Sequence, residues 1–166
     1  MGQHKVSKSN RTRSKVRHTQ RVNPLAVQRT LEQNRPYTEA EAHELAQRLH
    51  GVLNTLQTQS CTIQDVFELG LAMEVMLHVY EQRVMPVGEA GRELYAYATT
   101  ALDGARSLLD DCALRVMRQD LKITDKELEQ LRIGLDVYEQ SLVNITPLTL
   151  NNALAAIVRE TERNLT

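Results

Sequence analysis

Residues 62–84 read TIQDVFELGLAMEVMLHVYEQRV, and this stretch decides the fold class. Apolar residues occupy nearly every side of the helix that it would form, which is typical of a helix buried among others. Thr62 and Asp65 have the spacing of a capping box, in which each side chain accepts a hydrogen bond from a backbone N–H group at the helix start. We therefore expect a helix over about 63–84 at the centre of an all-α fold.

Further helices, each with one apolar face, are predicted on both sides of this segment. Threonine and glutamate form two more capping boxes, at 38–41 and 124–127, and an Asn-Pro and a Thr-Pro pair mark two other helix starts, at 23–24 and 146–147. The predicted helices cover residues 24–33, 39–56, 63–84, 89–118 and 125–142, and a last one begins near residue 147. No segment shows the alternation of a strand, so the sequence predicts a helical bundle of five to six helices.

The predicted core is mainly aliphatic, because the chain contains one Phe, no Trp and only 4% aromatic residues. Its candidates recur at intervals of three or four residues, which places them on one face of each helix. Outside the central helix these candidates are Ala42, Leu45, Leu49, Val52, Leu53, Leu56, Leu94, Ala98, Ala101, Leu102, Ala105, Leu108, Leu109, Cys112, Val116, Leu128, Leu131, Leu135, Tyr138, Leu142, Leu150, Leu154, Ile157 and Val158.

Charge divides the chain into unequal parts. Residues 1–35 hold nine basic residues and one acidic residue, a net charge of +8, whereas residues 36–166 hold 11 basic and 20 acidic residues, a net charge of −9. The first 22 residues are polar and contain almost no bulky apolar side chain, so they cannot offset the entropy lost on ordering. We expect a basic flexible arm over 1–22, a short helix and linker over 23–35, and an acidic helical bundle over 36–166.

Several catalytic and metal-binding patterns are approached but not met. His43 and Glu44 begin a zinc-protease motif, but the second histidine ligand is replaced by Gln47. His43 and His50 lie seven residues apart and share a helix face, without a third ligand in the sequence to complete a metal site. We predict no metal, no cofactor and no enzymatic activity.

A near-match to the magnesium site of all-α nucleotide pyrophosphatases involves two pairs of carboxylates. Glu41 and Glu44 supply the first pair, but Asp65 and Glu68 stand in inverted order where the second pair is required. Glu41 and Asp65 also have sufficient roles as members of capping boxes. We therefore expect that these four carboxylates do not converge. Cys112 falls on an apolar stripe, which indicates a core thiol rather than a nucleophile.

Two functional hypotheses follow from the basic arm. Its positive side chains alternate with small polar residues and no aromatic residue precedes Tyr37, so the arm can neutralise phosphates but has no platform for base stacking. The first hypothesis is a non-enzymatic accessory or regulatory protein, in which the arm binds DNA or RNA independently of sequence and the bundle binds a protein partner. The candidate nucleic-acid-binding residues are Lys5, Lys8, Arg11, Arg13, Lys15, Arg17 and Arg21.

The alternative is a protein-interaction or assembly module, whose arm docks on an acidic partner or on a neighbouring subunit. Two cysteines are too few for a disulfide framework, and no apolar run approaches the roughly 18 residues that cross a bilayer. These features predict a cytoplasmic protein without a membrane segment. The oligomeric state cannot be deduced from this pattern.

Overall fold

The computed structural model describes residues 24–83, 86 and 88–165, and these residues form six helices and no strand. The all-α helical bundle predicted from the sequence is therefore confirmed. The helices are α1 (Pro24–Asn34), α2 (Glu39–Gln57), α3 (Ile63–Glu81), α4 (Glu89–Met117), α5 (Asp125–Leu142) and α6 (Pro147–Asn164).

The helix starts lie where the capping residues predicted them. Thr38, Thr62 and Thr124 each accept a hydrogen bond from the backbone nitrogen three residues later, over 3.2–3.3 Å. The acidic residue at that later position accepts a hydrogen bond from the threonine backbone nitrogen in return, over 2.7–2.9 Å. Thr146 caps α6 in a similar way, with Pro147 at the first helical position. Local chemistry thus sets the start of four helices.

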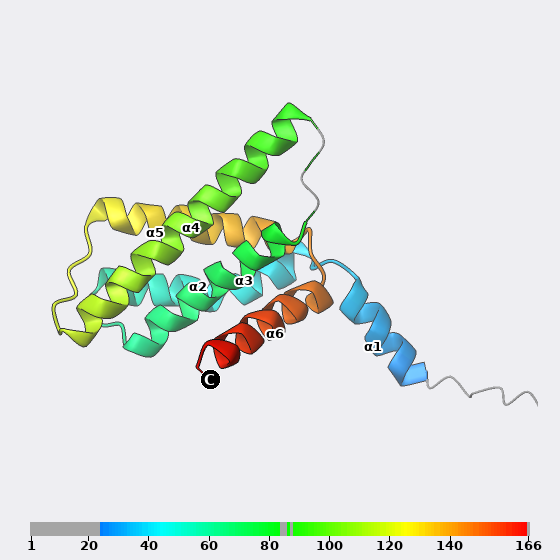
Figure 1. Ribbon diagram of the computed structural model, residues 1–166, viewed down its shortest axis with the longest axis horizontal. Helices are drawn as coiled ribbons and strands as arrows, with labels where there is room; N and C mark the ends of the chain where they lie inside the picture. Colours follow the sequence, from blue (N-terminus) through cyan, green and yellow to red (C-terminus); the bar gives the residue numbers. More distant parts are fainter. Residues whose placement is uncertain (1–23, 84–85, 87, 166) are drawn as a thin grey trace, which may run out of the picture.

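Helix α3 lies at the centre of the bundle, as its apolar sequence predicts, and contacts α2, α4, α5 and α6 (Figure 1). It buries Met73, Met76 and Leu69 completely. It ends at Glu81, three residues earlier than expected. Arg83, just beyond this end, lies over the ring of Tyr80 and donates a hydrogen bond to the backbone oxygen of Asn144 at 3.0 Å.

Helices α4 and α5 make a close approach that depends on a glycine. A Cβ atom placed on Gly134 of α5 would lie only 2.5 Å from the Cβ of Ala105 and 3.4 Å from the backbone oxygen of Ala101, both in α4. Such a distance is far below van der Waals contact between carbon atoms. The missing side chain at Gly134 therefore sets how closely the two helices pack.

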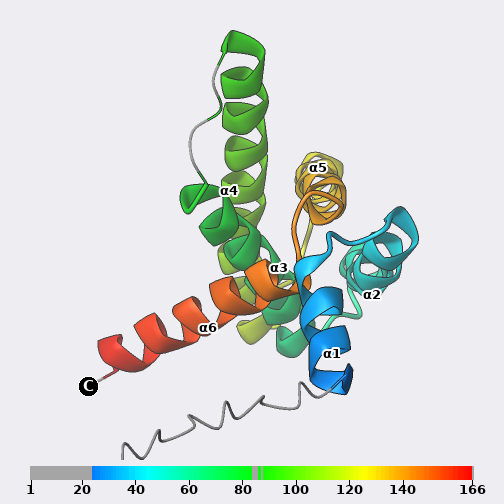
Figure 2. The ribbon, with the colours of Figure 1, turned by 90° about the vertical axis from the view of Figure 1, so that its right-hand side faces the viewer.

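Most predicted core residues are buried, but four are corrected by the structure. Leu94 exposes 69% of its surface, Val158 exposes 48%, Leu45 exposes 42% and Leu154 exposes 37%. Leu94 lies in the first turns of α4, which extend beyond the rest of the bundle (Figures 1 and 2). The other three belong to α2 and α6, which pack against fewer neighbours than α3 does. A helical stripe indicates which face turns inward, but not whether a neighbour covers it.

Helix α1 is set apart from the central helices. Among the described helices it contacts only α6, and both project from the bundle in Figure 2. The link from α1 to α2 is tied down at Tyr37, whose backbone nitrogen donates to the backbone oxygen of Ile145 at 3.2 Å. Within the described part of the chain, none of the helices has both the length and the hydropathy to span a bilayer.

Candidate interaction surfaces

The seven basic residues predicted to bind nucleic acid, Lys5, Lys8, Arg11, Arg13, Lys15, Arg17 and Arg21, lie outside the described residues. The structure does describe where the segment that follows them is anchored. The guanidinium of Arg35, just after α1, donates to the carboxylate of Glu41 at the start of α2, with an Nη1–Oε2 distance of 2.8 Å. Hydrogen bonds from Arg35 and from Thr38 lower the pKa of Glu41 to about 2. The end of α1 is thereby linked to the capping box of α2.

Several basic side chains of the bundle form ion pairs with acidic ones. Arg48 pairs with Glu68 at 2.7 Å, and Arg115 pairs with Glu127 at the same distance. Ion pairs also join Arg106 to Glu74, Asp103 and Asp110, Arg132 to Glu129, and Lys122 to Asp120. Because residues 36–166 carry nine more acidic than basic residues, these pairs leave an excess of negative charge on the bundle. A polyanion would be repelled by that charge.

An apolar surface runs along the outer side of α3. We call it the α3 face and define it by Leu45, Phe67, Leu71 and Leu154. Phe67 exposes 56% of its surface and Leu71 exposes 44%, and the two lie one helical turn apart. Leu71 lines two adjoining hollows, one on each side of α3. Exposed apolar patches of this kind mark interaction surfaces more often than isolated apolar residues do.

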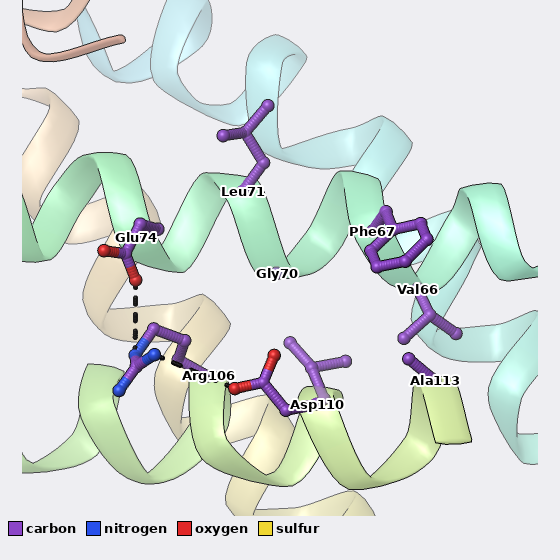
Figure 3. Close-up of a pocket in the computed structure, with 9 residues that line it drawn as sticks. Val66, Phe67, Gly70, Leu71, Glu74, Arg106, Asp110 and Ala113 are labelled. Carbon is purple, nitrogen blue, oxygen red and sulfur yellow. Dashed lines mark ion pairs between the residues drawn. The ribbon is translucent and has the colours of Figure 1, made fainter. Parts of the chain in front are cut away.

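The first hollow lies between α3 and α4 and has a volume of about 360 Å³ (Figure 3). Its apolar lining includes Val66, Phe67 and Ala113, which are labelled in the figure. An ion pair between Glu74 of α3 and Arg106 of α4, with an Oε2–Nε distance of 3.3 Å, closes one end. The floor is therefore apolar and the rim is charged, which suits the apolar side of an amphipathic helix.

The second hollow lies among α2, α3 and α6 and has a volume of about 310 Å³. Leu45 and Leu154, two of the residues expected in the core, line it together with Leu71. Arg48 and Glu68, which pair with each other, lie on its rim. Sequence reasoning missed this surface because Phe67 and Leu71 belong to the most apolar helix, and its pattern predicts burial on every side.

The structure joins His43 and His50 through a residue that the sequence did not single out. His43 Nδ1 lies 2.9 Å from one carboxylate oxygen of Glu139, and His50 Nε2 lies 2.9 Å from the other. The two histidines thus share a face of α2, as their spacing predicted, and bind α5. Hydrogen bonds from His50 and His43 lower the pKa of Glu139. No local signal indicates Glu139, because it lies about ninety residues further along the chain.

The carboxylates of the magnesium hypothesis are engaged separately. Glu41 binds Arg35 and Thr38, Asp65 binds Thr62, and Glu68 binds Arg48. The described residues contain no group of three or more histidine, cysteine or acidic side chains placed to hold a metal ion. Each of these three carboxylates therefore has a structural role.

The two thiols are free, and Cys112 is fully buried in the core, as its position on the apolar stripe predicted. Burial raises the pKa of Cys112 to about 11, which disfavours the nucleophilic thiolate. Burial also raises the pKa of Cys61. Neither thiol has the lowered pKa that marks a reactive cysteine.

Comparison with known proteins gives no match: no family model, no curated protein and no solved structure is significantly similar to this chain.

Proposed function

We propose that this protein is a non-enzymatic accessory protein that binds DNA or RNA through its basic N-terminal arm and a protein partner through its helical bundle. The observation that carries the proposal is the separation of charge. Residues 1–22 hold seven basic residues and no acidic one, whereas the net charge of residues 36–166 is −9. Lysine and arginine side chains at this density release counterions from a nucleic acid and bind its phosphates without reading sequence.

The surroundings of α1 support the assignment of nucleic-acid binding to the arm and protein binding to the bundle. Of the described helices, α1 contacts only α6, and Arg35 and Tyr37 fix its far end to the bundle. The arm therefore enters the fold through a peripheral helix rather than through the acidic centre. Within the bundle, Arg48, Arg106 and Arg115 are already paired with acidic side chains, which lowers their tendency to bind phosphate. Nucleic-acid affinity should consequently depend on residues 1–22.

The α3 face supports the second half of the proposal. It exposes Phe67 and Leu71 beside two apolar hollows, and charged residues surround them. This arrangement suits a helical segment that buries one apolar face and places polar groups at the rim. The bundle is thus suited to bind protein while the arm binds a polyanion.

The decisive experiment measures binding to a labelled duplex and to a labelled single strand by fluorescence anisotropy. We compare the full chain with a variant in which the seven basic residues of the arm are replaced by Gln. The control replaces exposed basic residues of the bundle, Lys122, Lys126 and Arg132, by Gln. We expect the arm variant to lose binding and the control to retain it, with log K falling by about five per tenfold rise in salt if five or six phosphates are engaged.

Two outcomes would contradict the proposal. Full binding by the arm variant would show that the arm does not bind the nucleic acid. Binding that does not respond to salt would point to protein-like recognition instead. Deleting residues 1–22 also separates the alternative function, in which the arm docks on a neighbouring subunit. A change of oligomeric state on deletion, without nucleic-acid binding by the full chain, would favour that alternative. Helical circular dichroism should remain nearly unchanged in every variant.

A further inference from the structure

Helix α1 is exposed along its length. Every position from Leu25 to Asn34 is exposed. Val27 and Leu31 lie one turn apart on the same side of α1, and they expose 41% and 67% of their surfaces despite the contact with α6. An isolated helix of 11 residues is marginal in water, and packing of its apolar side normally supplies its stability. The side that carries Val27 and Leu31 is therefore suited to a partner.

The α3 face is open in the same chain. Its most exposed residue, Phe67, is the only phenylalanine in the sequence. Gly70 lines the hollow beside it, between α3 and α4 (Figure 3). A Cβ atom placed on Gly70 would have the Cβ of Leu109 as its nearest neighbour from another helix, at 3.9 Å, which is an ordinary van der Waals distance. An incoming side chain therefore finds space next to Phe67.

The two open surfaces have matching spacings. Val27 and Leu31 are four residues apart, and so are Phe67 and Leu71, so each pair forms a short ridge along its helix. A hollow lies on each side of the ridge on α3. Helix α1 is about 16 Å long at 1.5 Å per residue, which is enough to lie along this ridge with its own apolar side chains in a hollow. An exposed aromatic side chain between apolar hollows with charged rims is typical of a binding hot spot.

Charge favours α1 over other occupants of the α3 face. The two hollows are lined by three acidic residues and two basic ones: Glu68, Glu74, Asp110, Arg48 and Arg106. They belong to a bundle with a net charge of −9, whereas α1 lies in a segment, residues 1–35, with a net charge of +8. Opposite charges steer such surfaces together. Two α3 faces placed against each other would instead bring two acidic bundles into contact.

The α1 helix of the same chain is held against another surface. Arg35 donates to Glu41, and the backbone nitrogen of Tyr37 donates to the backbone oxygen of Ile145, so the end of α1 is fixed to the bundle. Among the described helices α1 then contacts only α6, and the α3 face stays uncovered. If two copies exchange their α1 helices, each gives one helix and receives one, which closes the assembly with two-fold symmetry.

We propose that α1 of a second copy of this chain occupies the α3 face, and that two copies form a symmetric dimer by exchanging these contacts. The inference rests on the second half of the proposed function, because it names the protein partner of the α3 face. A dimer carries two arms, and two linked arms bind one polyanion more tightly than one arm does.

The first test is the association state of the full chain by sedimentation equilibrium, from 1 to 100 µM, in 0.15 M salt and without nucleic acid. We expect a dimer for the wild-type chain and a weakening of association by at least tenfold for both Leu31→Asp and Phe67→Asp. Leu94→Asp is a matched control, because Leu94 is 69% exposed and Leu31 is 67% exposed but they lie on different helices. The control should leave the dimer intact.

The second test locates the contact by cross-linking with a short bismaleimide in a Cys61→Ser background. The variant with both Leu31→Cys and Leu71→Cys should give a covalent dimer on a denaturing gel. The matched variant with Leu94→Cys and Leu71→Cys should give much less. A cross-link that forms only within one chain would show that α1 covers the α3 face of its own copy, and would overturn the proposal.

The sedimentation results also separate this inference from the proposed function. A monomeric wild-type chain at 100 µM would overturn the inference, as would a dimer that Leu31→Asp leaves intact. Neither result would affect nucleic-acid binding, which is measured on the same preparations by fluorescence anisotropy with the labelled duplex. If the full chain forms the dimer but does not bind the duplex, the proposed role of the arm fails and the dimer stands.

Discussion

Helices α5 and α6 are alike in sequence but differ in depth. Each has 18 residues, each begins after a capping threonine, and each carries an apolar stripe. Eight residues of α5 are buried, whereas α6 buries only Ala153. The difference comes from their neighbours: α5 packs against α2, α3 and α4, while α6 packs against α3 and the peripheral α1. A sequence with an apolar stripe therefore folds readily into a helix. The number of neighbouring helices decides how much that helix contributes to the stability of the fold.

The largest contrast is expected for a leucine from each stripe. Leu135 of α5 is fully buried, so Leu135→Ala should lower the free energy of unfolding by about 2–5 kcal/mol through lost contacts and a cavity. Leu154 of α6 is 37% exposed, so Leu154→Ala should cost less than about 1 kcal/mol. Urea unfolding followed by circular dichroism measures both. Equal losses would mean that α6 is as deeply integrated as α5.

The next contrast concerns the close approach of α5 to α4. Gly134→Ala should lower the free energy of unfolding by about 1–3 kcal/mol, because the new methyl group would overlap Ala105. Alanine favours a helix over glycine by about 1 kcal/mol, so a loss would show that packing outweighs propensity. Gly51→Ala in α2 is the control, since no atom lies within 4 Å of the added carbon. That variant should be more stable than the wild-type chain.

A smaller contrast is expected at the helix starts. Thr124→Ala removes the hydroxyl that accepts from the backbone nitrogen of Glu127, and should lower the free energy of unfolding by about 1 kcal/mol. Thr38→Ala should have a similar effect at α2. Thr146→Ala should cost less, because fraying of α6 exposes little buried surface. Thermal unfolding compares the three variants, and a larger loss for Thr146→Ala would reverse the ranking of the two helices.

The smallest expected effect is the change in the free energy of unfolding at acid pH that Glu127 of α5 causes. Hydrogen bonds from Arg115 and from Thr124 lower the pKa of Glu127 to about 2. The carboxylate therefore contributes stability that is fully present above its unfolded pKa of about 4.5 and is lost as the pH falls toward 2. Glu127→Gln should remove this part of the pH dependence of unfolding. An unchanged acid slope in that variant would show that the Arg115–Glu127 pair adds nothing to the link between α4 and α5.

Sequence patterns predicted the fold better than they predicted which residues are exposed on its surface. The capping threonines predicted four helix starts, and the apolar stretch around Met73 predicted the central helix. The exposed positions of Leu94 and Phe67 were not predicted, because both follow apolar patterns that also occur in buried helices. Glu139 was missed as the partner of His43, since nothing near it in sequence distinguishes it from the other acidic residues of α5. The role of the arm stays a prediction, because it rests on charge alone.

The sequence by itself determined the class of fold, the places where helices begin and the division of charge, because these depend on neighbouring residues and on local hydrogen bonds. Only the tertiary structure decided which apolar faces are covered. The exposure of Tyr97 depends on where α5 crosses α4, and the exposure of Phe67 depends on the gap between α3 and α4. Burial is a property of the whole assembly of helices, since the same stripe is core when a neighbour covers it and an exposed apolar surface when none does.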